Sequence, residues 1–463
     1  MTLNKTSGIY CCGTEKIMPN PYLPCWEYIP DGEPRVFGNR VYVYGSHDTA
    51  GSDQFCDFVL KCWSAPLDDL NSWTCHGDIF RTKATRDFGS DIDWNNDSTR
   101  LFAPDVVEKD GKYYLYAYII NGRGCVAVSD RPEGPFRLVS KYKYNISDEI
   151  CCNGWFIDPG VLVDNDGRAY IYCGFERSFM AELNSENMYE ILDDTCIEHI
   201  IPIEPDPEHG FREKESLFFE ACSLRRVGDT YYFIYSPKQG SRLAYATSDK
   251  PTGPFTYRGY IVDNGVDYPG GNNHGSIACI NGQWYIFYHR MTNGTIMSRR
   301  GCVEKIEILP DGTIPTVEMT SLGFEDSLSP YKITPADLAC VLKGGAFITE
   351  KSIFERVVTN ITADTVIGYK YFDFGDDFGS KTMEFNAQIN GAGCDCTLHI
   401  YADDEEIGSC EIGHDSGNIS TIVKSVTGRH AVYFKVSTAY TGWTGAYFKM
   451  RNLFELKSFV FTK

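Results

Sequence analysis

An internal repeat constrains the fold of this chain more than any other feature of its sequence. The aromatic-rich runs KYYLYAY at residues 112–118 and TYYFIYS at residues 230–236 match each other closely. Each is followed by a second strand-like run and then by a matching turn, SDRPEGPF at 129–136 and SDKPTGPF at 248–255. A likeness of this length indicates one structural unit that occurs more than once in the chain.

Weaker copies of the aromatic run extend the repeat to five units, which run from about residue 20 to residue 320. These copies lie at residues 41–44, 169–172 and 284–288. Dipeptides typical of tight hairpins precede most of the five runs, such as those at residues 110–111 and 281–282. Small repeated sheets that cannot bury both faces alone must stack on one another. The sequence therefore predicts an all-β fold that begins with a five-bladed β-propeller.

A second region follows the repeat. Prolines punctuate residues 309–335, and strand-like runs then appear around residues 367–374, 396–401, 431–436 and 454–461. We interpret residues 340–463 as a β-sandwich and residues 1–325 as the propeller, which would be the catalytic domain.

Charge and composition exclude several classes of partner. The net charge of −20 disfavours binding to nucleic acid or to an anionic membrane. The chain has no apolar run long enough to span a membrane, and its first twenty residues lack the apolar core of a secretory signal, so we expect a cytoplasmic protein. In that compartment the 18 cysteines are expected to be reduced, and their spacing does not predict a zinc site.

Each of the five units carries one ionisable residue shortly before its strand tyrosine. Counted back from Tyr42, Tyr114, Tyr170, Tyr232 and Tyr285, these residues lie 9 to 12 positions earlier. They are Asp31, Asp105, Asp158, Glu220 and His274. Equivalent positions on the innermost strands of a propeller converge on its axis, so we expect four carboxylates and one histidine around one central pit.

Such a cluster suits glycoside hydrolysis with inversion, which needs one protonated and one ionised carboxyl roughly 6.5–9.5 Å apart. Glu220 follows the apolar run 217–219, which would desolvate it and keep it protonated as the general acid. Asp31 lies in a more open, glycine-containing loop that suits an ionised base, and Asp158 would tune the acid. The alternative is that these acids only cap turns, as Asp and Glu before hairpins commonly do.

Other residues are weaker candidates for the site. His274 is predicted to hold an axial calcium ion directly or through water, or else to be a buried structural histidine. Arg290 is predicted to bind a sugar hydroxyl, with a structural salt bridge as the alternative. Aromatic side chains that could stack on sugar, or simply pack in the core, are Trp63, Phe102 and Trp155. His47 and the neighbouring Asp48 could reach the rim of the pocket or belong to a turn.

Five ordered motifs resemble glycoside hydrolase family 43. They are IPD at residues 29–31, APDV at 103–106, FIDPG at 156–160, FEACSLR at 219–225 and NHGS at 273–276. The resemblance covers roughly residues 18–310 and implies a five-bladed propeller and inverting hydrolysis.

The resemblance also implies a role for each matched residue. Asp31 would be the general base, Asp158 the modulator of the acid's pKa and Glu220 the general acid. His274 would match the histidine near the axial calcium, and Arg290 a substrate-contacting arginine. Two departures stand out: the aspartate of the base motif is followed by Gly32-Glu33-Pro34 rather than directly by proline, which leaves Glu33 as an alternative base, and Ala221 replaces the glycine that often follows the acid.

The C-terminal region resembles a family 6 carbohydrate-binding module, on the basis of residues 367–375, 428–434 and 454–459. This resemblance implies a β-sandwich. Tyr440 and Trp443 are candidate sugar platforms, with packing as the alternative.

The resemblance to family 43, with the propeller-plus-module layout and the expected cytoplasmic location, implies an exo-acting enzyme that releases terminal α-L-arabinofuranose from plant-cell-wall oligosaccharides. A β-D-xylosidase is the close alternative, since the two pentoses present similar hydroxyls. An alternative from another class is a non-catalytic sugar-binding propeller, which would be expected to lack one of the acids. The sequence predicts no oligomeric state and no linkage preference.

Overall fold

The computed structural model describes residues 19–92, 100–119, 123–139, 157–377, 379–414, 417–448 and 450–463. Their fold is all-β apart from one short α-helix and two 3-10 turns. Residues 33–306 form five separate antiparallel sheets in chain order, and residues 334–462 form two further sheets. We call these parts the five-sheet region and the two-sheet region. Among the described residues no helix is both long and apolar enough to cross a membrane.

The five-sheet region consists of four four-stranded sheets and one three-stranded sheet, each ordered as its strands follow along the chain or in reverse. The first two sheets contain β1 (Glu33–Phe37), β2 (Arg40–Gly45), β3 (Val59–Pro66) and β4 (Thr74–Arg81), then β5 (Leu101–Lys109), β6 (Lys112–Ile119), β7 (Arg123–Ser129) and β8 (Arg137–Leu138). The third and fourth contain β9 (Gly160–Val163), β10 (Ala169–Cys173), β11 (Phe179–Leu183) and β12 (Ile197–Glu198), then β13 (Phe218–Val227), β14 (Thr230–Pro237), β15 (Arg242–Ser248) and β16 (Thr256–Asp263). The fifth contains β17 (Ser276–Ile280), β18 (Gln283–Thr292) and β19 (Thr295–Ile306), and the 3-10 turn η1 (Asp193–Thr195) lies between β11 and β12.

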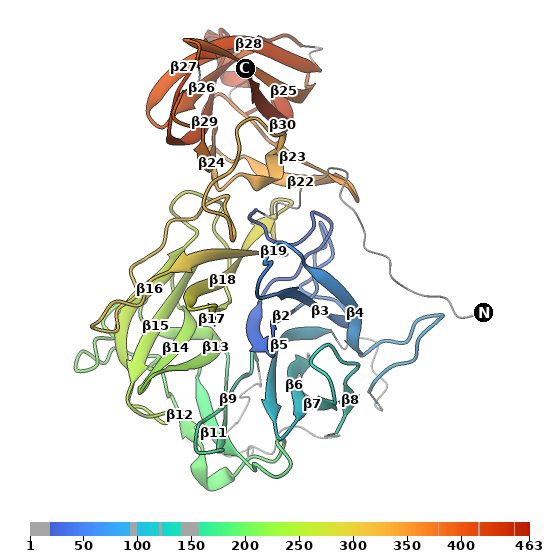
Figure 1. Cartoon of the computed structure of the whole chain (residues 1–463), viewed down its shortest axis with the longest axis vertical. Coiled ribbons are helices and arrows are strands. Elements are labelled where there is room, and N and C mark those ends of the chain that lie inside the picture. Colours follow the sequence, from blue (N-terminus) through green and yellow to red (C-terminus); the bar gives the residue numbers. More distant parts are fainter. Residues whose placement is uncertain are drawn as a thin grey trace.

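The first strands of the five sheets form a closed circle of contacts. β1 contacts β5, β5 contacts β9, β9 contacts β13, β13 contacts β17, and β17 returns to β1. A parallel bridge between Gly32 and Gly275 joins the start of the first sheet to the start of the fifth. The sheets are therefore grouped around one common centre (Figure 1).

The repeated turn links neighbouring sheets. In its two strong copies Phe136 and Phe255 are buried. The hydroxyl of Tyr44, in the first sheet, donates to the carbonyl of Pro132 at 2.6 Å, and that of Tyr172, in the third, donates to Pro251 at 2.9 Å. Each of these two copies of the turn therefore docks on the sheet that precedes its own.

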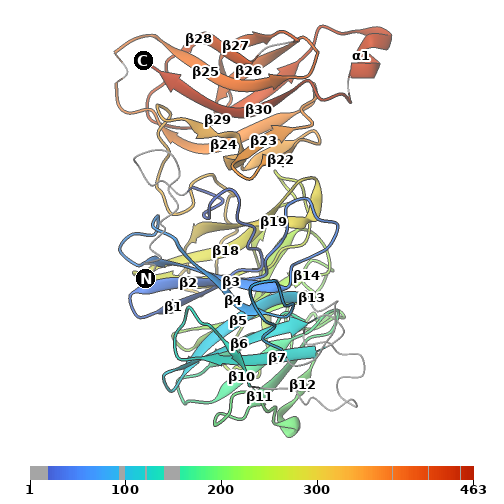
Figure 2. The same ribbon diagram turned by 90° about the vertical axis from the view of Figure 1, so that its right-hand side faces the viewer.

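The two-sheet region begins with β20 (Thr334–Pro335) and the 3-10 turn η2 (Ala336–Leu338). One sheet has the order β22-β23-β30-β25-β28, with β20 paired to β30, and the other has the order β21-β24-β29-β26-β27. Their strands are β21 (Val341–Lys343), β22 (Phe347–Ser352), β23 (Glu355–Thr359), β24 (Val366–Asp373), β25 (Thr382–Gly391), β26 (Cys396–Ala402), β27 (Glu405–Ile412), β28 (Asn418–Lys424), β29 (Arg429–Ser437) and β30 (Phe454–Thr462). The helix α1 (Gly442–Phe448) lies between β29 and β30, and Figure 2 shows it at one end of the region.

Aromatic side chains from both sheets pack between them. The rings of Tyr369 and Phe459 lie 4.8 Å apart, and those of Phe385 and Phe434 lie 5.5 Å apart. The four strand-like runs expected in this region coincide with β24, β26, β29 and β30. The same apolar cluster continues into the five-sheet region as far as Tyr232, so the two regions share a core.

Candidate active site

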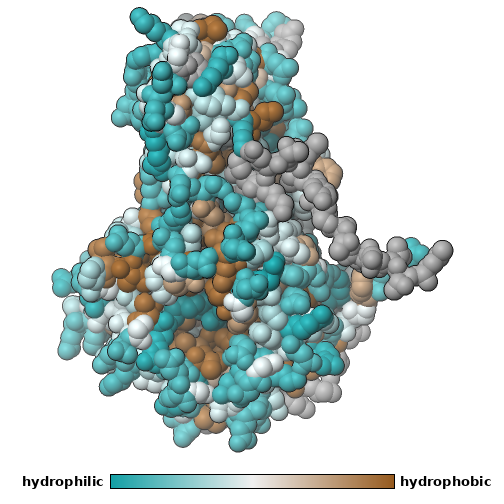
Figure 3. Space-filling model, viewed as in Figure 1, coloured by the Kyte–Doolittle hydropathy of each residue, from teal (hydrophilic) through white to brown (hydrophobic). Residues whose placement is uncertain are grey.

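A pocket of about 360 Å³ opens where the first strands meet. It is lined by Asp31, Phe55, Cys56, Phe102, Tyr118, Ile157, Asp158, Phe175, Phe219, Glu220, Asn272, His274, Ile296 and Arg299. Figure 3 shows hydrophobic surface gathered at a hollow over the five-sheet region. Three carboxyl groups among five aromatic rings in a pocket of this size are typical of a small-molecule site.

Equivalent residues of the first four sheets share an uncommon backbone conformation beside this pocket. Asp31, Ala103, Asp158 and Ala221 all have positive φ, at 57°, 30°, 54° and 68°. A positive φ costs a non-glycine residue about 1–3 kcal/mol and is concentrated at functional sites. The chain therefore bends sharply at the same place in four units, which turns the adjacent side chains toward the centre.

Irregular strand pairing gives Glu220 and Phe102 their positions. The register of β13 against β14 shifts on both sides of Glu220, and that of β5 against β6 shifts between Phe102 and Asp105. Such bulges re-aim a side chain and are common beside active sites. Glu220 thus reaches the pocket although it lies one residue before the equivalent position, which Ala221 occupies.

Asp31 is a buried carboxylate with strong hydrogen-bond donors. Its Oδ1 accepts from Arg299 Nη1 at 2.9 Å, and its Oδ2 accepts from the Ser46 hydroxyl at 2.6 Å. Burial acts to raise the pKa of Asp31, but the charge of Arg299 and the other neighbouring donors, including the Ser46 hydroxyl, together outweigh it and the pKa is lowered. Asp31 is consequently ionised at neutral pH.

His289 holds the backbone of Asp31. Its Nδ1 accepts from the Asp31 N–H at 3.3 Å, and its Nε2 lies 3.1 Å from the carbonyl of Asn272, to which it donates. Burial and the charge of Arg299 lower the pKa of His289 to about 3, so the ring is neutral and can keep one nitrogen as an acceptor.

The pKa values of Glu220 and Asp158 are raised, whereas that of Asp31 is lowered. Burial, followed by the charge of Asp31, raises the pKa of Glu220 to about 7. Burial also raises the pKa of Asp158, to which the nearby charges of Glu220 and Asp31 add, although His274 opposes them. The Ala221 N–H donates to Asp158 Oδ2 at 3.1 Å. The pocket therefore contains one ionised carboxylate and a neighbouring pair that retains a proton near neutral pH.

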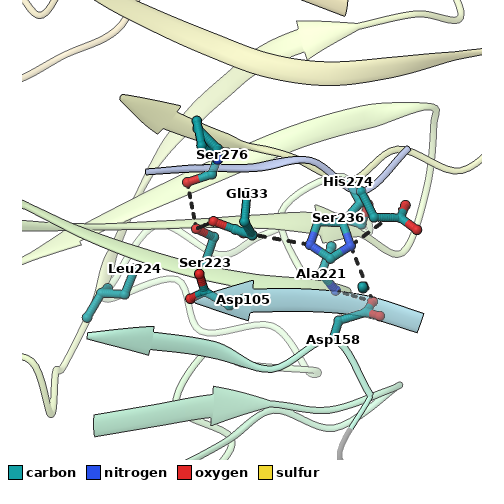
Figure 4. Close-up of polar contacts among 12 residues, drawn as sticks. Glu33, Asp105, Asp158, Ala221, Ser223, Leu224, Ser236, His274 and Ser276 are labelled. Carbon is teal, nitrogen blue, oxygen red and sulfur yellow. Dashed lines mark hydrogen bonds and ion pairs between the residues drawn. The ribbon is translucent and has the colours of Figure 1, made fainter. Parts of the chain in front are cut away.

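His274 lies between this pocket and a second, deeper layer of polar residues (Figure 4). Its Nδ1 is 3.7 Å from Asp158 Oδ2, and its Nε2 is 3.9 Å from Glu33 Oε1. Glu33 lies two residues beyond Asp31 and pairs with Arg225, while Oε1 has no hydrogen-bond partner. Asp31 lines the pocket, whereas Glu33, two residues further along, belongs to the deeper layer.

The prediction that Asp105 contacts substrate is corrected by this layering. Asp105 lies two residues beyond Ala103 and is fully buried beneath the pocket. Its carboxylate accepts from Arg35 Nε at 2.9 Å and from the Val161 N–H at 2.8 Å. Asp105 and Arg35 therefore form a structural ion pair on the axis. Asp105 lies 9 residues before its strand tyrosine, rather than 11, because it belongs to the deeper layer.

Arg290 also lies away from the pocket. It is buried against Tyr288 and Glu304, with Nη2 3.1 Å from Glu304 Oε1 and 2.8 Å from the carbonyl of Thr320. The alternative of a structural salt bridge describes it correctly. The arginine that does line the pocket is Arg299, whose Nε donates to Asp48 Oδ2 at 2.8 Å.

Of the remaining candidate residues, some line the pocket and others pack away from it. Phe102 lines the pocket. His47 does not: its Nε2 lies 3.0 Å from Glu27 Oε1, and Trp63 donates to the same carboxylate from the core at 2.9 Å. Both are therefore packing partners of Glu27. Trp155 lies outside the described residues.

Arg299 and most of the aromatic lining were not found from the sequence. Phe55, Tyr118, Phe175 and Phe219 reach the pocket from loops and strand ends whose place depends on the ring of sheets. One signal for Arg299 was available: Arg299-Arg300 interrupts a long strand-like run. Neighbouring strand residues point to opposite faces, and Arg300 accordingly pairs with Asp337 of the two-sheet region at 2.8 Å.

Comparisons with known proteins agree with this geometry. Residues 34–314 match the family model of glycosyl hydrolases family 43. A protein of Thermoclostridium stercorarium named xylosidase/arabinosidase is 41% identical over 407 residues, covering 76% of this chain and 82% of its own. An arabinoxylan arabinofuranohydrolase of Paenibacillus polymyxa is 26% identical over 479 residues, covering 92% of this chain and 72% of its own.

A crystal structure of a family 43 arabinoxylan arabinofuranohydrolase from Bacillus subtilis has the same overall fold. It aligns with a TM-score of 0.54 at 22% identity, covering 96% of this chain and 97% of its own. With a family match over most of the five-sheet region and a relative of 41% identity, the chain belongs to glycosyl hydrolases family 43 and is a glycoside hydrolase.

Proposed function

We propose that this enzyme is an inverting, exo-acting hydrolase that releases terminal α-L-arabinofuranose from arabinoxylan or arabinan oligosaccharides. Asp31 is the general base, Glu220 the general acid, and Asp158 tunes the acid. The observation that carries the proposal is the meeting of these three carboxyls in one pocket with opposite pKa shifts. Such a pair in opposite protonation states is what inversion requires.

The proposed reaction is a single displacement. Asp31 accepts a proton from a water whose oxygen attacks the anomeric carbon. Glu220 donates its proton to the glycosidic oxygen as the bond to the leaving sugar breaks. Asp158 accepts the Ala221 N–H and lies within electrostatic reach of Glu220, which favours the protonated form of the acid.

The pocket lining supports a short ligand with an apolar face. Phe102, Phe175 and Phe219 present rings to the cavity, and rings of this kind stack on the apolar faces of sugars. A volume of about 360 Å³ fits the lower end of small-molecule sites rather than a groove for a long chain. This supports exo action on the end of an oligosaccharide.

A β-D-xylosidase activity is the second candidate, because the relative of 41% identity is named for both activities. An assay of the full-length enzyme on paired aryl α-L-arabinofuranoside and aryl β-D-xyloside tests the proposal. We expect the larger kcat/KM on the arabinofuranoside. A larger value on the xyloside would replace the first candidate with the second, and activity on neither would reject exo-pentosidase action.

We also propose that the five-sheet region is a five-bladed β-propeller and the two-sheet region a β-sandwich of the carbohydrate-binding type. Trp443 on α1 is 96% exposed, and Tyr447 lies one helical turn further along and is exposed as well. These two rings support a sugar platform. Tyr440 packs against the core and its hydroxyl accepts from the Asp395 N–H at 3.0 Å, so Tyr440 is a packing residue.

We also propose that the enzyme binds a calcium ion, without a part in the catalytic steps. Among the described residues no three His, Cys, Asp or Glu side chains gather as a metal would require. Between the two layers, His274 Nε2 lies 3.9 Å from Glu33 Oε1, which accepts no hydrogen bond from the described residues. Calcium prefers six to eight oxygen ligands, so these side chains do not form its shell and no catalytic step is assigned to it. Elemental analysis of the purified enzyme decides whether an ion is bound.

A further inference from the structure

The first hairpin of the two-sheet region, β22–β23, lies against the five-sheet region (Figures 1 and 2). It contacts two segments that lead to the pocket. One is the β18–β19 turn at Asn293 and Gly294, after which β19 carries Ile296 and Arg299 into the pocket lining. The other is the segment that precedes Asp31, which the hairpin meets at Tyr28.

Asn293 connects the hairpin to β19. Its N–H donates to the Ile348 carbonyl at 2.6 Å, and its Oδ1 accepts from the Glu350 N–H at 2.9 Å and the Thr349 hydroxyl at 3.1 Å. Its Nδ2 donates to the Ser298 hydroxyl at 2.9 Å. One amide side chain therefore joins β22 to the residue immediately before Arg299.

Tyr28 connects the hairpin to the loop that carries Asp48. The Tyr28 hydroxyl accepts from Arg356 Nε at 3.0 Å and lies 3.4 Å from Glu350 Oε2. Arg356 is buried and also donates to Glu350 at 2.6 Å. At the other end of the residue, the Tyr28 carbonyl accepts from the Asp48 N–H at 2.9 Å.

Both routes end at the same pair of groups. Asp48 Oδ2 accepts from the Arg299 N–H at 3.0 Å and from Arg299 Nε at 2.8 Å. The same guanidinium donates to Asp31 at 2.9 Å. The Ser298 hydroxyl, which Asn293 holds, also accepts from the Gly51 N–H in the loop after Asp48, at 3.2 Å. The hairpin thus holds Asp48 and Arg299 from two sides.

We infer that the β22–β23 hairpin of the two-sheet region positions Arg299 against Asp31, with Tyr28, Asn293 and Arg356 as positioning residues for the hydrolytic reaction. This inference rests on the proposed role of Asp31 as the base. It gives the two-sheet region a part in catalysis that is separate from sugar binding. None of the three positioning residues lines the pocket, so their effect is transmitted through Asp48 and Arg299.

The charged and titratable groups that face Asp31 come from several elements. They are Asp48 after β2, Cys56 before β3, Asp158 before β9, Glu220 on β13, His274 before β17, His289 on β18 and Arg299 on β19. Of these, Arg299 is the cation that lowers the pKa of Asp31 most, so a misplaced Arg299 raises that pKa.

Two conservative substitutions in the full chain test the inference. Asn293→Gly removes the bridging amide but suits the positive φ of 54°. Tyr28→Phe removes only the hydroxyl. For each variant we expect kcat to fall about tenfold or more, since small misplacements of catalytic groups are costly. We also expect the acid limb of the kcat/KM profile to move to higher pH while KM changes less.

Matched controls separate positioning from stability. Asn281→Gly changes another Asn-Gly turn with positive φ, and Tyr331→Phe removes a hydroxyl that donates to the Phe374 carbonyl of the two-sheet region at 2.9 Å. We expect both controls to keep the wild-type pH profile at a comparable loss of melting temperature. Test variants that lose thermal stability but keep the wild-type acid limb and kcat would overturn the inference.

Asp31→Asn, measured in parallel, separates this inference from the proposed function. If Asp31→Asn retains activity, Asp31 is not the base and both statements fail. If Asp31→Asn is inactive while Tyr28→Phe and Asn293→Gly behave as wild type, only the positioning role is rejected.

Discussion

Arg299 holds two buried carboxylates at once, those of Asp31 and Asp48. The arrangement is specific to arginine, because its planar guanidinium donates in two directions while a lysine presents a single point charge. Phe55 covers the guanidinium, with its ring centre 5.0 Å from the central carbon. The ionised state of Asp31 depends on its ion pair with Arg299 more than on any other contact in the pocket.

The substitution Arg299→Lys therefore changes the pH dependence of the enzyme. Asp31 must be ionised to accept a proton, and a weaker partner lets its pKa rise. At mildly acidic pH more Asp31 is then protonated and inactive, so the acid limb of kcat/KM moves to higher pH. We expect kcat/KM near neutral pH to fall about tenfold or more. A pH–rate profile of both enzymes on one aryl glycoside checks this, and an unmoved acid limb would contradict it.

At the scale of strands, the shared bend before each sheet explains what the sequence could and could not predict. The repeat placed Asp31, Asp158 and His274 at equivalent positions, and all three line the pocket. Relative to Ala103 and Ala221, which occupy the equivalent positions in their own sheets, Asp105 departs by two residues and Glu220 by one residue. One departure marks a deeper layer and the other a bulge, and spacing alone cannot distinguish them because both depend on strand register.

Arg299 was missed for a related reason. Its side chain enters the pocket from the last strand of the fifth sheet rather than from the innermost strand, so the alignment of repeats gave it no weight. Arg290 follows the aromatic run and is therefore the arginine that the sequence predicts for the site, yet it is buried beside Glu304. The all-β fold and the strands of the C-terminal region were predictable because alternation and turn dipeptides are local signals.

At the scale of the whole molecule, the two-sheet region meets the rest of the chain over a shared core and at the β22–β23 hairpin. Its helix α1 carries the exposed Trp443. These features lie on different parts of the region, so sugar binding and support of the pocket can be changed separately.

Trp443→Ala tests the binding role. We expect this variant to lose retardation in gels containing arabinoxylan, since stacking on an aromatic ring is the main contact that α1 offers. Hydrolysis of a small aryl glycoside should stay within about twofold of wild type. Ile422→Ala, which alters another exposed apolar side chain of the region, is the control. Equal retardation of Trp443→Ala and wild type would exclude Trp443 as a platform.

The proposed division of labour between Glu220 and Asp31 is tested most directly by the leaving-group dependence of Glu220→Ala. General acid catalysis contributes about 10²- to 10⁴-fold, and an aryl group that leaves without protonation does not need it. The account predicts that kcat of Glu220→Ala falls by about that factor on a natural arabino-oligosaccharide and much less on an aryl arabinofuranoside with a good leaving group. Equal losses on both substrates, or full activity on the oligosaccharide, would contradict it.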